Sequence, residues 1–403
     1  MKTGRPMSAF SDRIEHTDTQ AHLTQLWRRR LDTLIAGVAN GDPYYQQIAN
    51  AAEHISAEQQ GRFLIELLQN ANDQAVRAGL TDSLVTITRT DRIIAFGNNG
   101  QPFDADKVDR ITSIFMSDKT ADECIGNKGI GFKAVYQVSD SAEVFSSALG
   151  DTLAEGAKIS FRMVRRPFDD EAFMTIAKVI VSDLLDNQTA RREQIQTRFA
   201  GDDAVDVVLR EAARAAWFSF PIPATKDLFE SRLAELQLSE TILRETQTLI
   251  VLPLEGDTEL AGRVSRAIDE IQGTDQHLTD DPPAASLLFL PGIGRIDVVD
   301  RTRAIRSELR KKVFDTEKLS DGIMLHRKRT TRTDHYRSIS ETDPMVSSQD
   351  WWVVERMIGG GDHRDESCLE AERQSIRDSI QSLRLPEENW KGVEEVGHPM
   401  AGS

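Results

Sequence analysis

This sequence has few cysteines, no long apolar run and no net positive charge. Its 403 residues include two cysteines, Cys124 and Cys368, which are too few for a disulfide framework and fit a reducing compartment. No segment approaches the roughly 18 apolar residues that a membrane-spanning helix needs. The first residues, MKTGRPMSAFSDR, also lack the apolar centre of a secretory signal. These absences predict a cytoplasmic protein with no membrane partner.

The charge balance is acidic, with 65 Asp and Glu against 49 Lys and Arg, which gives a formal net charge of −16. This argues against a protein whose main role is to coat nucleic acid, because phosphate contacts need clustered basic side chains. Residues 301–337 are an exception, since this segment is basic and contains the run HRKRTTR. Two interpretations stay open for it: a nucleic-acid contact, or a solvated basic face that balances an acidic protein.

The length and the order of the patterns predict two domains of mixed helices and strands, an α+β fold class. Residues 1–18 are polar and have no pattern, so we expect a mobile arm there. Residues 19–255 form the first expected domain, and residues 256–403 form a smaller α/β domain. The end at Ser403 fits either a natural terminus or a cut through a longer protein.

Hydrophobic periodicity predicts the individual elements. The second helix is expected to begin with Ser56 as its N-cap and to close at Gly79. The other expected helices lie at 21–39, 105–115 and 258–272, with a mainly helical stretch at 170–216. The expected strands are a hairpin of 84–88 and 92–96, single strands at 143–147, 158–165 and 247–253, and two strands around the Pro-Gly turn within 286–299. Residues 132–138 fit either a helix or a strand.

The first chemical pattern is a polar stripe on the second helix, in the string ELLQNAND. Glu66, Asn70 and Asp73 follow one another at i, i+4 and i+7, so a helix places them on one face. The neighbouring face is apolar, which would set the stripe at the rim of a pocket. A carboxylate can deprotonate water, and an amide oxygen is a suitable ligand for Mg²⁺. The simpler alternative is a solvated helix face.

Two glycine-containing turns follow. In FGNNGQPF a strand runs into a turn in which Asn98, Asn99 and Gly100 tolerate positive φ angles. In GNKGIGFK, residues 126–133, glycines spaced G-x-x-G-x-G expose backbone N–H groups that can cradle an anion. This spacing differs from the dinucleotide-binding fingerprint, in which G-x-G-x-x-G directly follows a strand.

The order of these motifs, with a threonine opening the late strand TLIVLPL, resembles the superfamily of gyrase, Hsp-type chaperones, histidine kinases and MutL. The strings ELLQNAND, FGNNGQPF, SIFMSDKT and GNKGIGFKAVYQVSD are most similar to its sacsin-type branch. The strong motifs cover residues 56–147, and a weaker resemblance reaches about residue 300. The resemblance implies a Bergerat fold, an α/β sandwich that binds ATP and Mg²⁺ under a lid, here expected at residues 104–125.

The resemblance also implies residue roles. Glu66 is implied to be the general base that activates water, Asn70 the Mg²⁺ ligand, and Asp73 a carboxylate near the ribose and adenine. The residues implied to hold the adenine are Asn98, Gly100, Phe103 and Thr248. Lys119 is implied to be a lid lysine near the nucleotide. The residues implied to form the phosphate cradle are Gly126, Gly129, Gly131 and Phe132.

Two positions depart from the usual pattern of the superfamily. Asn98 stands where an aspartate is usual, so an uncharged amide would accept from the adenine amino group. Pro102 replaces a glycine, which should stiffen the turn.

The implied function is an ATPase whose lid closure or dimerisation acts on a protein partner, as in a chaperone or a defence system. One alternative is a nucleotide-sensing interaction module with little or no turnover. Another is a nucleic-acid-handling ATPase that uses residues 301–337.

Overall fold

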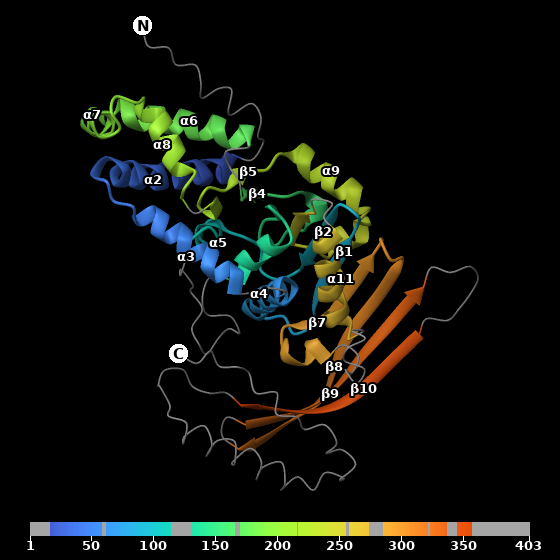
Figure 1. Ribbon diagram of the computed structural model, residues 1–403. Coiled ribbons are helices and arrows are strands. Elements are labelled where there is room, and N and C mark those ends of the chain that lie inside the picture. Colours follow the sequence, from blue (N-terminus) through green and yellow to red (C-terminus); the bar gives the residue numbers. More distant parts are fainter. Residues whose placement is uncertain are drawn as a thin grey trace. The chain divides into compact units, whose positions relative to one another are not determined.

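The computed structural model describes residues 17–58, 62–113, 131–165, 170–215, 217–254, 258–273, 285–320, 323–336 and 345–356. These residues form a mixed α+β fold around a ten-stranded sheet (Figure 1), so the expected fold class is confirmed at this level. The expected N-terminal arm and most of the expected lid lie outside the described residues. Within the described ranges, no helix is long and apolar enough to cross a membrane.

The elements agree with most of the expected ones. The helices are α2 (Thr17–Asn40), α3 (Tyr44–Glu58), α4 (Phe63–Arg77), α5 (Ala105–Ile111), α6 (Glu171–Asp186), α7 (Thr189–Arg198), α8 (Ala204–Ala212), α9 (Lys226–Leu236), α10 (Glu240–Arg244) and α11 (Thr258–Gln272). The short 3₁₀ helices are η1 (Gly131–Gln137), η2 (Leu153–Glu155), η4 (Trp217–Ser219) and η5 (Ala285–Phe289). The strands are β1 (Ser83–Arg89), β2 (Ile93–Asn98), β3 (Ser141–Ser146), β4 (Ile159–Val164), β5 (Ile222–Pro223), β6 (Thr248–Pro253), β7 (Ile293–Asp300), β8 (Ile305–Ser320), β9 (Ile323–Tyr336) and β10 (Met345–Arg356).

Three expectations on local structure were wrong or incomplete. Ser56 is not an N-cap, because it lies inside α3, a helix that the periodicity did not predict. The site helix α4 begins instead at Phe63, after an Arg62 whose side chain makes no cap hydrogen bond. Residues 285–289 form η5 and not a strand, so only the second of the two strands expected around the Pro-Gly turn is present. Residues 132–138, left open between helix and strand, fall mainly in η1.

The strand order of the sheet is β10-β9-β8-β7-β1-β2-β6-β3-β4-β5. The expected hairpin of β1 and β2 is confirmed, and the Thr90 hydroxyl closes it by accepting from the Arg92 and Ile93 amides, both at 3.2 Å. β1 also pairs in parallel with β7, which comes much later in the chain. β6 lies between β2 and β3 and is antiparallel to both, so three strand ends meet near Asn98.

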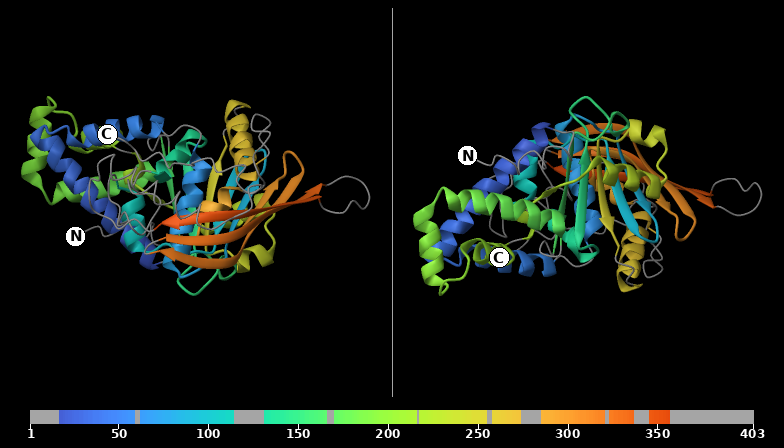
Figure 2. Two further views of the ribbon diagram at one scale, coloured as in Figure 1. Left: turned by 90° about the horizontal axis from the view of Figure 1, so that it is seen from below. Right: turned by 90° about the horizontal axis from the view of Figure 1, so that it is seen from above.

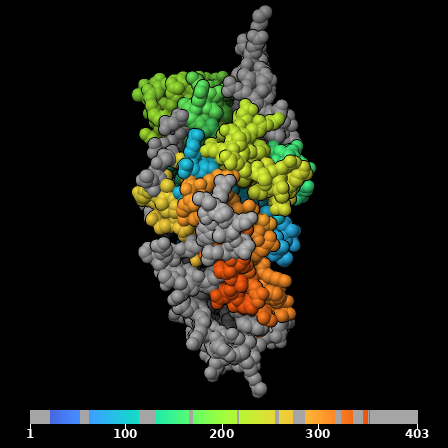
Figure 3. Space-filling view, turned by 90° about the vertical axis from the view of Figure 1, so that its right-hand side faces the viewer, coloured from blue at the N-terminus to red at the C-terminus, as the bar shows by residue number. Residues whose placement is uncertain are grey.

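One face of the sheet carries the largest apolar core. The strands turn residues such as Val85, Ile87 and Phe96 toward α4, η1 and α11, whose own apolar residues complete this core. On the opposite face, Phe145 packs against Phe229 of α9 with ring centroids 5.0 Å apart. The outer residues of α9, yellow-green in Figure 3, lie on the surface of the molecule. The sheet is therefore covered by helices on both faces near the end of β6.

A second apolar core joins α2 to α6, α7 and α8, and both views of Figure 2 show these helices together and away from α11. The apolar residues of α2 recur at helical spacing, so they line one face. Trp27 lies at the centre, with its ring 5.1 Å from that of Phe173 and 5.2 Å from that of Phe220. Its indole N–H donates to the Pro221 carbonyl at 2.7 Å, so the buried polar atom is satisfied.

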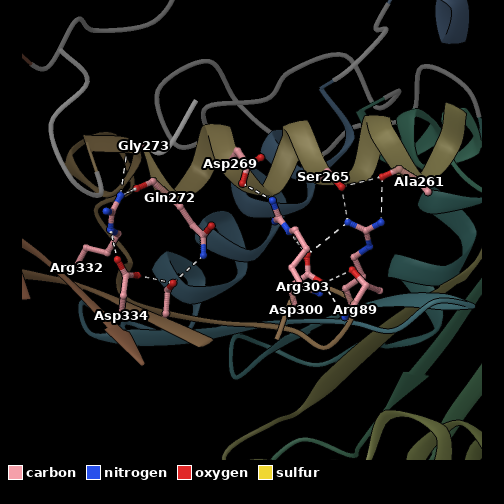
Figure 4. Close-up of polar contacts among 12 residues, drawn as sticks. Arg89, Ala261, Ser265, Asp269, Gln272, Gly273, Asp300, Arg303, Arg332 and Asp334 are labelled. Atoms are coloured by element: carbon pink, nitrogen blue, oxygen red, sulfur yellow. Dashed lines mark hydrogen bonds and ion pairs between the residues drawn. The ribbon is translucent and has the colours of Figure 1, made fainter. Parts of the chain in front are cut away.

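A polar cluster with a buried ion pair at its centre fixes α11 to the sheet (Figure 4). We call Arg89, Ser265, Asp269, Asp300 and Arg303 the Asp300 cluster. Asp300, at the end of β7, accepts from the Arg303 side chain at 2.6 Å and from Arg89 of β1 at 3.4 Å. The same two arginines donate to Asp269 and Ser265 of α11, at 2.7 and 2.6 Å. The cluster therefore ties one helix and two strands together.

The chain divides into two compact units, one of residues 1–312 and 329–350 and one of residues 313–328 and 351–403. The described residues of the second unit all belong to β8, β9 and β10. Among them, Arg327 lies over the ring of Phe314, 5.8 Å from its centroid. The domain boundary expected at residue 255 stays a prediction.

Candidate functional site

The polar stripe of α4 is present as one face of a helix. Glu66, Asn70 and Asp73 all lie in α4, and Glu66 is in its first turn, where the helix dipole favours a negative charge. Glu66 and Asn70 are half-buried, whereas Asp73 is 1% exposed. Because the Asp73 carboxylate is almost completely buried, this face of α4 is not the fully solvated face that the simpler alternative expected. The apolar residues of α4 that pack on the sheet are Phe63, Leu64, Leu67, Leu68 and Ala71.

The glycine-rich segment reaches the start of α4 at Gly131. A Cβ atom placed on Gly131 would overlap the end of the Glu66 carboxylate and lie 3.0 Å from its Cδ atom, so the carboxylate would have to shift. The absence of a Cβ therefore lets the backbone at Gly131 lie directly against the carboxylate. The structure thus brings together two motifs that stand 65 residues apart in the sequence.

The turn after β2 packs against the other end of α4. The Asn98 Oδ1 atom accepts from the Gly100 amide at 3.2 Å, so this side chain does shape the turn. A Cβ on Gly100 would lie 2.8 Å from the Cβ of Gln74, and the Gln101 amide donates to the Gln74 carbonyl at 3.2 Å. The turn therefore contacts α4 directly after Asp73.

A row of polar residues crosses the sheet at this end. Asn98, Thr248 and Ser146 are register partners on β2, β6 and β3. Side chains two residues apart in a strand share a face, so these three point the same way as the buried residues beneath α4, namely Phe96, Ile250 and Val144. Asn98 is 7% exposed, Thr248 2% and Ser146 0%. We call these three residues the polar row.

The two predicted phenylalanines flank this region. Phe103 is half-buried, packs on the core under α4, and has its ring 6.0 Å from that of Phe161 in an edge-on arrangement. Phe132, in η1, is 8% exposed and belongs to the same core. Both aromatic rings therefore serve the core of the sheet in this structure. The three remaining predicted residues, Lys119, Gly126 and Gly129, lie outside the described residues.

Two residues with a part in this arrangement were not predicted. Ser146 bonds Thr248, and a serine in the buried series Ala142, Val144 and Ser146 is a signal that strand alternation could have supplied. Asn72 is 2% exposed, and its Oδ1 atom accepts from the Gly292 amide at 2.8 Å, which holds α4 to the turn before β7. That partner is 220 positions away, so no local pattern reveals it.

Lys133, the last residue of the GNKGIGFK string, lies against the end of α5 and the Phe218 ring. Its side chain is buried, and the ammonium group donates to the carbonyls of Ile111 and Ser113, at 3.0 and 2.7 Å, at the end of α5. It also lies over the Phe218 ring, 4.8 Å from the centroid. Burial, and then the nearby Arg30 guanidinium, lower the pKa of Lys133 from 10.5 to about 7. Lys133 therefore caps a helix with a charge that is lost near neutral pH.

Replacing Lys133 with methionine should change how stability depends on pH. Between pH 7 and 10.5 the unfolded chain holds a proton on this amine that the folded chain has released, so unfolding becomes harder as pH rises. We expect the free energy of unfolding of the natural protein to rise from pH 7 to 9, and the slope to flatten in Lys133→Met. Urea unfolding at several pH values measures this. Lys178→Met, which removes an exposed lysine of α6, should keep the natural slope; equal slopes in all three proteins would contradict the assignment.

Comparison with known proteins gives a limited result. No family model matches this chain. A stretch of 107 residues, 26% of the chain, is 31% identical to Protein NO VEIN of Arabidopsis thaliana. The match covers 4% of that plant protein, so the chain corresponds to a small part of it. This similarity supports common ancestry over about a quarter of the chain, and it gives no information about activity.

Proposed function

We propose that α4, η1 and the adjoining ends of β2 and β6 form an ATP-binding site that hydrolyses ATP with Mg²⁺. We also propose that the domain has the Bergerat fold of the gyrase, Hsp-type chaperone, histidine kinase and MutL superfamily, in its sacsin-type branch. The observation that carries the proposal is the close approach of Gly131 to Glu66. The last glycine of the expected anion cradle and a carboxylate that could activate water are side by side there, as phosphate hydrolysis requires.

The buried polar residues at the other end of α4 support a site for the base and sugar. Asp73 offers a carboxylate, Asn98 an amide oxygen and Thr248 a hydroxyl, all less than 8% exposed. Polar groups in such surroundings discriminate strongly between ligands, because a mismatched partner leaves a buried group without a hydrogen bond. The Asn98 Oδ1 atom already accepts from Gly100, and its second lone pair is the one that would accept from an adenine amino group.

Mg²⁺ would be held mainly by phosphate and water. Among the described residues there is no group of three or more His, Cys, Asp or Glu side chains arranged to hold a metal. Mg²⁺ keeps several waters and binds nucleotide phosphates with few protein ligands, so a single amide such as Asn70 fits this mode. When bound, the ion would offset the phosphate charge. Glu66 would accept a proton from the attacking water, and the backbone N–H groups near Gly131 would face the phosphate oxygens.

Calorimetry on the full chain tests the proposal. A non-hydrolysable ATP analogue should bind in the presence of Mg²⁺, and EDTA should weaken that binding. In Asn70→Ala the affinity with Mg²⁺ should fall toward the affinity measured in EDTA, because the amide ligand is gone. Absence of binding by the natural protein at millimolar analogue would overturn the proposal. Steady-state phosphate release then separates an ATPase from a sensing module that binds ATP without turnover.

We propose further that nucleotide-dependent movement acts on a protein partner, with a homodimer as one form of the active state. The basic segment gives little support to a nucleic-acid partner, because several of its arginines already pair with carboxylates. In the first unit, Arg303 pairs with Asp269 and Asp300, and Arg332 pairs with Asp334 at 3.0 Å. A positive charge that is already compensated attracts phosphate less strongly.

A further inference from the structure

Ser146 is a buried serine at the end of β3 whose hydroxyl joins two parts of the proposed site. The Phe103 amide donates to Ser146 Oγ at 2.9 Å, which holds the segment after the Asn98 turn. On its other side, Ser146 Oγ lies 2.9 Å from Thr248 Oγ1 of β6. The hydroxyl is 0% exposed, so water does not compete for these bonds. One side chain therefore sets the positions of Phe103 and Thr248.

A hydroxyl group has one donor and two acceptor positions, so Ser146 and Thr248 can form only a few hydrogen-bond arrangements. Ser146 has one proton and two acceptor lone pairs, and one lone pair is taken by the Phe103 amide. If the proton goes to Thr248 Oγ1, the Thr248 hydroxyl is free to donate to a ligand. If it goes instead to the Gln247 carbonyl, 3.4 Å away, Thr248 donates to Ser146 and can only accept from a ligand. The 3.4 Å distance from Ser146 Oγ to the Gln247 carbonyl is long for a bond between two oxygens, which disfavours the second arrangement and leaves the first.

We propose that Ser146 is a positioning residue for nucleotide recognition. It orients the Thr248 hydroxyl as a donor toward the base end of the site and fixes the backbone of Phe103 beside it. This inference rests on the proposed ATP site. A purine whose ring nitrogen accepts at that point gains from the oriented donor, so Ser146 contributes to base selectivity without contacting the base.

The neighbouring residue provides a matched control. Ser147 is also a serine with 0% exposure, but its hydroxyl donates outside the site, to the carbonyls of Asp151 at 3.0 Å and Ala148 at 3.2 Å. Ser146→Ala should weaken binding of the ATP analogue about 10-fold and lower the preference for ATP over GTP, since a lost buried hydrogen bond changes an equilibrium by about this factor. Ser147→Ala should leave both values within about twofold of the natural protein. The rate of hydrolysis at saturating ATP should change little in either variant.

Two further measurements keep the test decisive. Ser146→Cys has nearly the natural side-chain volume and serves if the alanine variant does not fold; its weak S–H donor should also raise the dissociation constant. In a Thr248→Val background, Ser146→Ala should have a smaller effect than in the natural protein, because part of its role passes through Thr248. If the natural protein binds neither nucleotide, the proposed function fails and this role fails with it. If it binds ATP while Ser146→Ala and Ser147→Ala behave alike, only the role of Ser146 is overturned.

Discussion

Replacing Glu66 with glutamine is expected to lower the rate of ATP hydrolysis by about 10²–10⁴-fold, the usual contribution of a general base. Glutamine keeps the size and the hydrogen-bonding oxygen of the side chain but cannot take a proton from water at neutral pH. The affinity for ATP should stay nearly natural, because the carboxylate acts on water and not on the nucleotide. Steady-state phosphate release gives the rate, and calorimetry with the non-hydrolysable analogue gives the affinity.

Gly131→Ala provides an independent approach to the same carboxylate. An added Cβ would push the Glu66 side chain out of its position, so this variant should also hydrolyse ATP slowly. Because both changes act on one group, the double variant should be little slower than Glu66→Gln alone. A Glu66→Gln protein that releases phosphate at the natural rate would remove Glu66 from the reaction. Fully additive losses would mean that Gly131 acts elsewhere, for example only on the phosphate.

Replacing Asp300 with alanine is expected to destabilise the protein by about 3–5 kcal/mol, the range found when one partner of a buried ion pair is removed. The side chains of Asp300 and Arg89 are 0% and 6% exposed, so the arginine would be left charged and without its carboxylate in the interior. Burial acts to raise the pKa of Asp300, but hydrogen bonds from Thr302 and Arg303 and the nearby guanidinium charges lower it overall. The carboxylate is therefore ionised and supports the fold at neutral pH. Urea unfolding, followed by fluorescence and circular dichroism, measures the loss.

The control for this prediction is an ion pair at the surface. Asp202 pairs with Arg210 at 3.1 Å, but the two side chains are 55% and 50% exposed. Water and salt screen such a pair, so Asp202→Ala should cost less than about 1 kcal/mol. If both variants unfold at the natural urea midpoint, the Asp300 cluster does not fasten α11 to the sheet.

The features of the fold that the sequence predicted are those that depend on local spacing. The apolar period of α2 and the short apolar runs of β1, β2 and β6 correspond to elements whose bounds agree within a few residues. The error at Ser56 has a physical cause: residues with good helix propensity continue on both sides of it, so a favourable capping residue does not by itself start a helix. The strand expected before the Pro-Gly turn is absent for a related reason. A short apolar run fits a 3₁₀ turn such as η5 as well as it fits a strand.

The candidate site could be predicted only as far as its motifs are continuous in the sequence. Glu66 and Asp73 were found because one helix carries both, and Asn98 because it ends a strand. Ser146 bonds Thr248 through strand register, and Asn72 bonds the distant Gly292, and no single stretch of sequence contains either relation. The same is true of the Asp300 cluster, which gathers residues from 89 to 303. Function itself remains a proposal that the binding and turnover measurements decide.

The parallel pairing of β1 with β7 has a consequence for how the protein is made. During synthesis, β1 is complete when residue 89 has been added, whereas β7 begins only at residue 293. At about 5–20 residues per second, the interval is roughly 10–40 s. Throughout it, one edge of β1 offers unpaired N–H and C=O groups, and such an edge readily pairs with the wrong strand. The exposed edge of β1 therefore needs shielding in the nascent chain until β7 has been synthesised.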